Sequence, residues 1–196
     1  MKTKVITTGY KYTDIDAFAS GLALAQGLKL RGQKAMVVFP GPLNHSVSAT
    51  IRNWNFEYET KPPVEIGEVV LVDVSKTDSL PDFVNYHNVV KIYDHHFGFE
   101  DYWKEKLGDN AKIEPLGAIA TMIWEEIKNI PDISKIEKKY FNALYTAVVS
   151  NTLNFKAELT TDRDKKAFRE LKDFVDLPKI GSKVIFMNKS ARVLPI

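Results

Sequence analysis

The sequence predicts an α/β protein built on an open, mostly parallel β-sheet flanked by helices. Short β-branched runs alternate along the chain with longer segments whose apolar residues recur at helical spacing. The runs VVLVDV (69–74) and NVVKIYDHH (88–96) are typical of strands buried in a parallel sheet. Turn signals separate the elements. This alternation is the pattern of a parallel sheet covered by helices.

The elements follow one another in a regular order. A strand is expected at 4–8, bounded by Gly9, and a helix at 16–30, ending before Gly32. A second strand at 35–39 stops at the turn signal PGP. The remaining predicted elements are strands at 69–74 and 88–96 and helices at 117–128, 135–149 and 162–175.

Capping patterns support three of these helices. A hydroxyl residue followed three positions later by an acid predicts a capping box, in which each side chain bonds the other residue's backbone N–H. The predicted pairs are Thr13 with Asp16, Ser134 with Glu137 and Thr161 with Asp164.

The chain's 196 residues suit a single domain, which we place at 1–176. The apolar last residues, 177–196, are expected to form a tail that makes a docking or oligomer contact. The chain has 27 basic and 25 acidic residues, so its overall charge does not favour nucleic acid or an anionic membrane as a partner. It has no cysteine, no predicted transmembrane segment and no apolar signal region, which leads us to expect a cytoplasmic protein.

Polar residues gather where predicted strands and one helix end. In open α/β sheets ligands bind beyond the carboxyl ends of the strands. Several carboxylates meeting there would repel one another, and bound cations relieve that repulsion. Carboxylates with few histidines suit Mn²⁺ or Mg²⁺ better than structural zinc. The candidate residues are Asp14, Asp16, Asp73, Asp94, His95, His96 and Asn151.

Each candidate also has a purely structural interpretation. Asp14 and Asp16 could only begin a helix, since acidic residues suit a helix N-terminus. Asp73 alone could cap a turn. Neighbouring histidines of a strand point to opposite faces, so only one of the pair would face the crevice unless the chain turns there. Asn151 could end its helix as a C-cap.

Four segments together resemble a known family. DIDAFAS, LVDVS, YDHHFGFEDYW and VVSNTLNFK occur in the order and spacing of the four motifs of the DHH phosphoesterases. The similarity is greatest to the N-terminal domain of the branch that contains family II manganese-dependent inorganic pyrophosphatases and exopolyphosphatases. It extends from about residue 4 to residue 175, and PGPLNHS and EPLGAIATMIWE agree with it.

The resemblance implies a site for one or two Mn²⁺ or Mg²⁺ ions. Asp14 would serve one cation and Asp16 the other, Asp73 would bridge them, and His95 would be a ligand of the second. Two cations sharing a carboxylate stand about 3.5–4 Å apart, the spacing of two-metal phosphoryl chemistry.

The resemblance also implies roles around the cations. His96 would contact the phosphate and assist proton transfer, and Asp94 would orient the neighbouring ring. Lys156 matches a lysine of the first domain and could supply a cation to the substrate, or be a solvated loop residue.

The sequence departs from that branch in three places. Tyr10 stands where the branch has a histidine ligand, and a neutral phenol binds metal poorly. Asn151 replaces an aspartate, so as a ligand it would bring no charge. The second, basic domain of the pyrophosphatases does not follow within 196 residues. We therefore expect an open cleft, or one completed by another subunit or partner protein.

These features predict a metal-dependent phosphohydrolase for pyrophosphate, short polyphosphate or another small phosphoanhydride. A non-catalytic or weakly active module that binds metal and a phosphorylated ligand is the main alternative, favoured by Tyr10 and Asn151. A nuclease of short oligonucleotides is a third, disfavoured by the balanced charge and the lack of a basic aromatic stripe.

Overall fold

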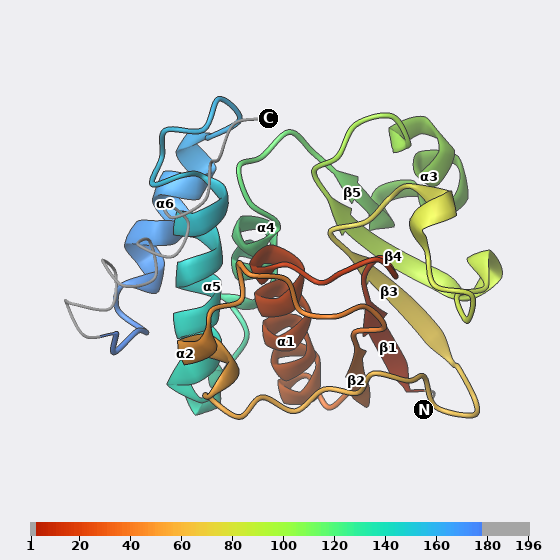
Figure 1. Ribbon diagram of the computed structural model, residues 1–196, viewed down its shortest axis with the longest axis horizontal. Coiled ribbons are helices and arrows are strands. Elements are labelled where there is room, and N and C mark those ends of the chain that lie inside the picture. The colour runs from red at the N-terminus through yellow and green to blue at the C-terminus, as the bar shows by residue number, and fades with distance from the viewer. Residues whose placement is uncertain (1–2, 178–196) are drawn as a thin grey trace.

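The computed structural model describes residues 3–177, so the predicted tail lies outside the described residues except for its first position (Figure 1). The strands are β1 (Lys4–Thr7), β2 (Ala35–Val38), β3 (Glu68–Val72), β4 (Val89–Asp94) and β5 (Ala111–Ile113). The α-helices are α1 (Ile15–Leu30), α2 (Ala49–Arg52), α3 (Glu100–Leu107), α4 (Ile119–Ile127), α5 (Lys138–Asn151) and α6 (Asp162–Leu171). Short 3₁₀ helices occupy Thr77–Ser79, Tyr86–Asn88, Gly108–Asn110 and Ile133–Lys135.

The five strands form one parallel sheet in the order β2-β1-β3-β4-β5, which confirms the predicted fold class. The chain leaves β1 toward β2 and later returns to place β3 on the other side of β1. The carboxyl ends of β1 and β3 therefore flank a topological switch point, the usual place for a ligand crevice in such sheets.

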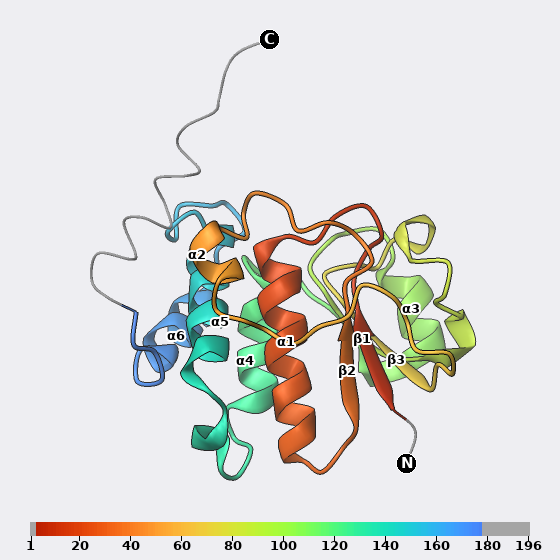
Figure 2. The same ribbon diagram turned by 60° about the horizontal axis from the view of Figure 1, so that its bottom comes forward.

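Helices cover both faces of the sheet, but unequally. Helices α1 and α4 pack on one face with α5 and α6 outside them, whereas α3 stands alone on the other face (Figures 1 and 2). Successive residues of β3 point to opposite faces of the sheet. Val70 and Val72 join the large core around α1, and Val69 and Leu71 join the smaller core that holds Trp103.

Helix α1 is the centre of the larger core. It is buried nearly all round, because the sheet covers one side and α4 and α5 cover the others. Gly27 allows α4 to approach closely, since a Cβ there would lie 2.6 Å from the Cγ2 atom of Ile127. The helix that follows the first strand is thus a rigid support for the residues at its N-terminus.

The Thr161–Asp164 capping box is confirmed, and the other two predicted boxes are wrong. Helix α1 has Asp14 rather than Thr13 as its N-cap, and the Oδ1 atom of Asp14 accepts the N–H groups of Asp16 (3.0 Å) and Ala17 (2.9 Å). The cap lies one residue later than predicted, because a carboxylate in this position reaches two amides at once.

Helix α5 starts later than its sequence pattern suggested. Its N-cap is Glu137, whose side chain makes no capping bond, and Ser134 lies in a preceding 3₁₀ turn. Helix α6 ends at Leu171, four residues before the predicted end.

Three short elements were not predicted at all. Helices α2 and α3 each bury one residue, Ile51 and Trp103, so they carry no helical apolar period to recognise. Strand β5 has three residues and is only half-buried at the edge of the sheet. Within residues 3–177, no helix is both long and apolar enough to cross a membrane.

Candidate metal centre

A cleft of about 550 Å³ opens at the carboxyl ends of β1, β3 and β4. Of the residues that the sequence singled out, the cleft is lined by Asp14, Asp73, His95, His96 and Asn151. Asp14 comes from the end of the β1–α1 loop, Asp73 follows β3, and the histidines follow β4. Segments separated by up to 137 positions (14 and 151) therefore meet at the switch point of the sheet.

Asp73 is the buried acid at the centre of this site. Its φ of +57° lies in the left-handed region, and its N–H donates to the carbonyl of Tyr93 (2.8 Å), so the chain turns sharply as β3 ends. Its side chain is 8% exposed, yet its Oδ1 atom accepts no hydrogen bond from any described residue. Burial, and then the carboxylates of Asp14 and Asp16, raise the pKa of Asp73 well above its usual range.

The ring of His95 is held in one orientation by the backbone. Its Nδ1 atom lies 3.0 Å from the carbonyl oxygen of Leu116, so Nδ1–H donates and Nε2 keeps its lone pair. Nε2 faces the Oδ1 atom of Asp73 at 3.5 Å. A lone pair and a carboxylate oxygen that face each other repel unless a proton or a cation lies between them, so this pair fits a cation.

His96 is oriented by a carboxylate instead. The Oδ1 atom of fully buried Asp94 accepts from the Nδ1–H of His96 (2.7 Å) and from the backbone N–H of His95 (2.8 Å). Because the chain turns directly after Asp94, both rings approach Asp73 rather than opposite faces of the sheet. The hydrogen bond that His96 donates to Asp94 raises the pKa of His96, whose side chain is 62% exposed in the cleft.

Asp14 begins α1 and also reaches the cleft, so its role as a metal ligand stays a prediction. Its Oδ1 atom caps α1, and the residue lines the cleft together with Asp73. Ligand atoms of Asp73, His95 and His96 lie within 4.8 Å of one another, and Asp14 lines the same cleft. This donor set suits Mn²⁺, or Mg²⁺ with less preference.

Asp16 lies behind the cleft and is engaged elsewhere. It is fully buried, does not line the cleft, and accepts from the N–H groups of Ile119 (2.7 Å) and Ala120 (2.9 Å) at the start of α4 and from the Nδ2 of Asn151 (2.5 Å). Burial raises the pKa of Asp16 to about 6. Because Asp16 does not line the cleft, its role as a metal ligand stays a prediction.

Asn151 is the last residue of α5, and the C-cap is Thr152, so the interpretation of Asn151 as a C-cap is wrong. The left-handed backbone begins two residues later and covers three consecutive residues, Leu153, Asn154 and Phe155. Asn151 instead faces both the cleft and the carboxylate of Asp16.

Two predicted site residues are not brought to the cleft. Tyr10 is 46% exposed and its backbone N–H donates to the carbonyl of Ser79, but it does not line the cleft. Lys156 is an exposed residue of the turn after α5 and does not line it either. The roles that the resemblance implied for these two residues stay predictions.

Sequence reasoning missed four side chains that line the cleft. Lys11 and Lys76 bring positive charge, and Lys76 pairs only loosely with exposed Asp78 (3.2 Å). Tyr12 and Phe97 are 57% and 63% exposed, unusually high for large aromatic side chains. The available signal was adjacency, because these residues stand one to three positions from the motif residues Asp14, Asp73 and His96.

This fold and this set of residues define a class of proteins. Residues 4–148 match the DHH family, N-terminal domain, and the chain belongs to that family.

The chain is also similar to individual proteins whose descriptions are more specific than that of the family. The chain is 28% identical over 172 residues to a probable manganese-dependent inorganic pyrophosphatase of Bacillus licheniformis, covering 86% of this chain and 54% of that protein. It is 30% identical over 182 residues to a protein of the same description from Oceanobacillus iheyensis, covering 91% and 58%. The chain spans about half the length of the curated relatives it matches.

Solved structures share the fold. A Methanococcus jannaschii protein assigned as a family II inorganic pyrophosphatase superposes with a TM-score of 0.72 at 23% identity, covering 95% of this chain and 61% of that one. An exopolyphosphatase-related protein from Bacteroides fragilis gives 0.71 at 16% identity, covering 95% and 56%. At these identities the likeness concerns the fold alone.

Proposed function

We propose that this domain is a metal-dependent phosphohydrolase that acts on pyrophosphate, short polyphosphate or another small phosphoanhydride. Asp14, Asp73 and His95 would hold the cation, which we expect to be Mn²⁺ or Mg²⁺. The observation that carries the proposal is the buried Oδ1 of Asp73, which has no donor among the described residues and faces the free Nε2 of His95 at 3.5 Å. The manganese dependence of the relatives supports the choice of metal.

When bound, the cation would supply Lewis-acid chemistry, by lowering the pKa of a water molecule and neutralising phosphoryl charge. The chain's own cations, Lys11 and Lys76, would bind the outer phosphate oxygens, since both line the cleft. This would neutralise part of the substrate's charge.

His96 would donate a proton to the leaving phosphate oxygen. Its Nδ1–H is held by Asp94, so Nε2 is the atom free to exchange a proton with the substrate. The raised pKa keeps a larger fraction of His96 protonated near neutral pH, which suits donation to a leaving phosphate oxygen. Asp94 therefore acts as a positioning residue for this ring.

The arrangement favours one cation over two. Both oxygens of Asp16 are engaged, and Tyr10 lies away from the cleft. A second cation would need Asp16 to reach the cleft, which it does not line, and Asn151 to present its amide oxygen. We therefore propose a mononuclear centre in the resting state.

Two other functions have specific support. The bonds that hold Asp16 favour a binding module that keeps one cation and a phosphorylated ligand without turnover. Exposed Tyr12 and Phe97 favour a phosphoester that carries a planar base, such as a short oligonucleotide, because bases stack on aromatic rings. A partner protein or second copy that completes the cleft would also cover these rings.

One set of assays distinguishes the phosphohydrolase, the binding module and the nuclease. The protein is titrated with Mn²⁺ and assayed on pyrophosphate, tripolyphosphate and a dinucleotide beside Asp73→Asn. Asparagine is the sharpest replacement, because it tolerates the left-handed backbone of Asp73 and removes only the charge. The proposal expects Mn²⁺-dependent phosphate release that is lost in Asp73→Asn. Binding without release supports the module, and faster cleavage of the dinucleotide than of pyrophosphate supports the nuclease.

A further inference from the structure

We infer that Asp164, a buried acid of α6 outside the cleft, is a positioning residue for His95 and acts on it through a single peptide unit. The inference rests on the proposed function in one respect, since it takes His95 as a metal ligand. The path has two hydrogen bonds, and both belong to the peptide group that joins Leu116 to Gly117.

The carbonyl oxygen of that group is Leu116's, and it lies 3.0 Å from the Nδ1 of His95. The N–H of the same group is Gly117's, and it donates to the Oδ2 of Asp164 at 3.1 Å. In a trans peptide the C=O and N–H bonds point in opposite directions. The carboxylate and the imidazole therefore lie on opposite sides of one planar group.

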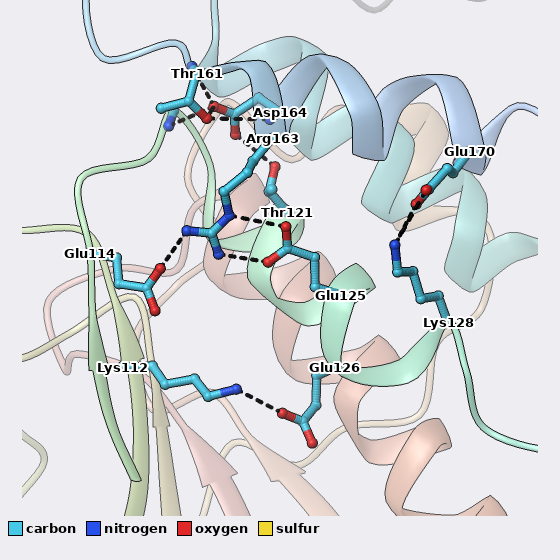
Figure 3. A network of polar contacts seen from close by, with 11 residues as sticks. Lys112, Glu114, Thr121, Glu125, Glu126, Lys128, Thr161, Arg163, Asp164 and Glu170 are labelled. Carbon is cyan, nitrogen blue, oxygen red and sulfur yellow. Dashed lines mark hydrogen bonds and ion pairs between the residues drawn. The ribbon is translucent and has the colours of Figure 1, made fainter. Parts of the chain in front are cut away.

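The carboxylate of Asp164 is fixed at its end of this path. Asp164 is fully buried, and its Oδ1 accepts from the hydroxyl of Thr121 on α4 (2.6 Å). Its Oδ2 accepts from the backbone N–H of Thr161 (2.8 Å) in the α6 capping box (Figure 3). Bonds from both helices leave this side chain little freedom to rotate.

The Leu116–Gly117 peptide, which lies between Asp164 and His95, is also confined. A Cβ at Gly117 would lie 2.7 Å from the Cγ2 of Thr152 and 3.0 Å from the Oδ2 of Asp164, so only glycine allows this approach. Thr152 follows Asn151 directly, so the same contact ties the peptide to the end of α5. The Leu116 carbonyl thus reaches His95 from a rigid base.

The consequence is electronic as well as steric. A carboxylate that accepts from one side of a peptide polarises the group, and its carbonyl becomes a stronger acceptor on the other side. This favours the tautomer of His95 that is protonated at Nδ1 and leaves Nε2 free toward Asp73. His96 receives the same help directly from Asp94, whereas His95 receives it through the peptide.

Asp164 also links α6 to α4, so a structural role must be separated from a positioning role. Glu170 provides the control, because it joins the same two helices by accepting from the Nε1 of Trp124 (2.7 Å) and the Nζ of Lys128 (2.9 Å). It lies near the C-terminal end of α6, whereas Asp164 lies in its first turn (Figure 3).

The test compares Asp164→Asn with Glu170→Gln in the full chain. We measure Tm, the Kd for Mn²⁺ by calorimetry, and the His95 tautomer in metal-free protein by long-range ¹H–¹⁵N NMR near pH 8, above the ordinary imidazole pKa of about 6.5. Asp164→Asn should weaken Mn²⁺ binding by about 10-fold or more, the usual effect of losing a partner behind a ligand, and should populate Nε2–H at His95. Glu170→Gln should lower Tm only.

A similar loss of Tm in both variants, with unchanged tautomer and Kd in Asp164→Asn, would overturn the inference. If Asp164→Asn does not fold, the wild-type spectrum still decides, because His95 protonated at Nε2 contradicts the relay. If the wild type binds no Mn²⁺, the proposed function fails, while the tautomer comparison continues to test the relay on its own.

Discussion

Two clusters of charged residues, one in the cleft and one across α4, differ in how their carboxylates are balanced. In the cleft, the Oδ1 of Asp73 and the Oδ2 of Asp94 are buried without a hydrogen-bond donor among residues 3–177. Across α4, Glu126 accepts from Arg31 (3.0 Å), Lys91 (3.0 Å) and Lys112 (3.2 Å).

Other carboxylates on and around α4 are also paired with basic side chains. Arg163 reaches from α6 to Glu125 (2.6 Å) and Glu114 (2.5 Å), and Lys128 pairs with Glu170 (2.9 Å) (Figure 3).

The pKa values record this difference. Burial raises the pKa of Glu126, but the hydrogen bonds from Arg31 and Lys91 outweigh it and bring the value down to about 2. The pKa of Asp73 moves the other way, because burial and the neighbouring carboxylates both raise it. Glu126 is thus matched by basic side chains of the chain, whereas the buried Oδ1 of Asp73 has no hydrogen-bond donor among residues 3–177, which supports the proposal that a cation binds there.

The largest expected effect, on Mn²⁺ affinity, comes from Asp73→Asn, which removes the charge of the buried carboxylate in the cleft. Mn²⁺ affinity should fall by more than about 100-fold, beyond the usual effect of losing an outer partner. The metal-free variant should be as stable as the wild type or more stable at pH 7, because an unmatched buried charge is removed. Calorimetry and thermal melts measure the two effects.

Glu126→Gln is the matched control for that variant. It should lower Tm, because it leaves three cations without their carboxylate, and it should leave the Kd for Mn²⁺ unchanged. Equal loss of stability in Asp73→Asn and Glu126→Gln would show that both clusters are structural.

Two acids, Asp16 behind the cleft and Glu126 across α4, should also give opposite pH dependences. Asp16 is raised from 3.8 to about 6, so the folded state holds more protons than the unfolded state between these values. Stability of the metal-free protein should therefore fall as pH rises from about 4 to 6, by up to about 3 kcal/mol. Glu126 is lowered from 4.5 to about 2, so its contribution is lost as pH falls below 4.5.

Chemical denaturation of metal-free protein across this range tests the sign. A stability maximum between about pH 4 and 5 is expected. A steady rise in stability from pH 4 to 7 without metal would contradict the raised pKa of Asp16.

Asn151→Asp should add one more unmatched carboxylate to the cleft. It replaces the amide that donates to Asp16 with a second acid, so metal-free stability should fall by about 1–3 kcal/mol. With Tyr10→His as well, Mn²⁺ should bind more tightly, and the stoichiometry should rise from one ion toward two. Unchanged affinity and stoichiometry in the double variant would count against the alignment of these positions with the family's ligands.

The smallest effect is expected on the exposed side of the matched network. Arg163→Gln removes two ion pairs whose side chains are partly exposed, so the loss should be no more than about 1 kcal/mol. Metal binding should not change. A loss above 2 kcal/mol in urea titrations would show that the network is more than a surface feature.

The sequence by itself determined the sheet and the family. The strands at β1, β3 and β4 follow from apolar runs, and Asp14, Asp73 and His95 follow from the motifs placed after those strands. These features are local in the chain, so periodicity and motif spacing could find them. Helix α3 was not predicted, because Trp103 is the one buried residue among its eight and no apolar period results.

The tertiary structure decided what each acid contacts. Asp14 and Asp16 stand one residue apart, yet Asp14 faces the cleft while Asp16 turns back to cap α4, more than a hundred positions away. Tyr10 and Lys156 sit within family motifs but lie outside the cleft. Asp164 showed only a capping box in the sequence, and its path to His95 depends on how α6, α4 and one buried glycine pack. Such contacts depend on packing between distant elements, and no local pattern encodes them.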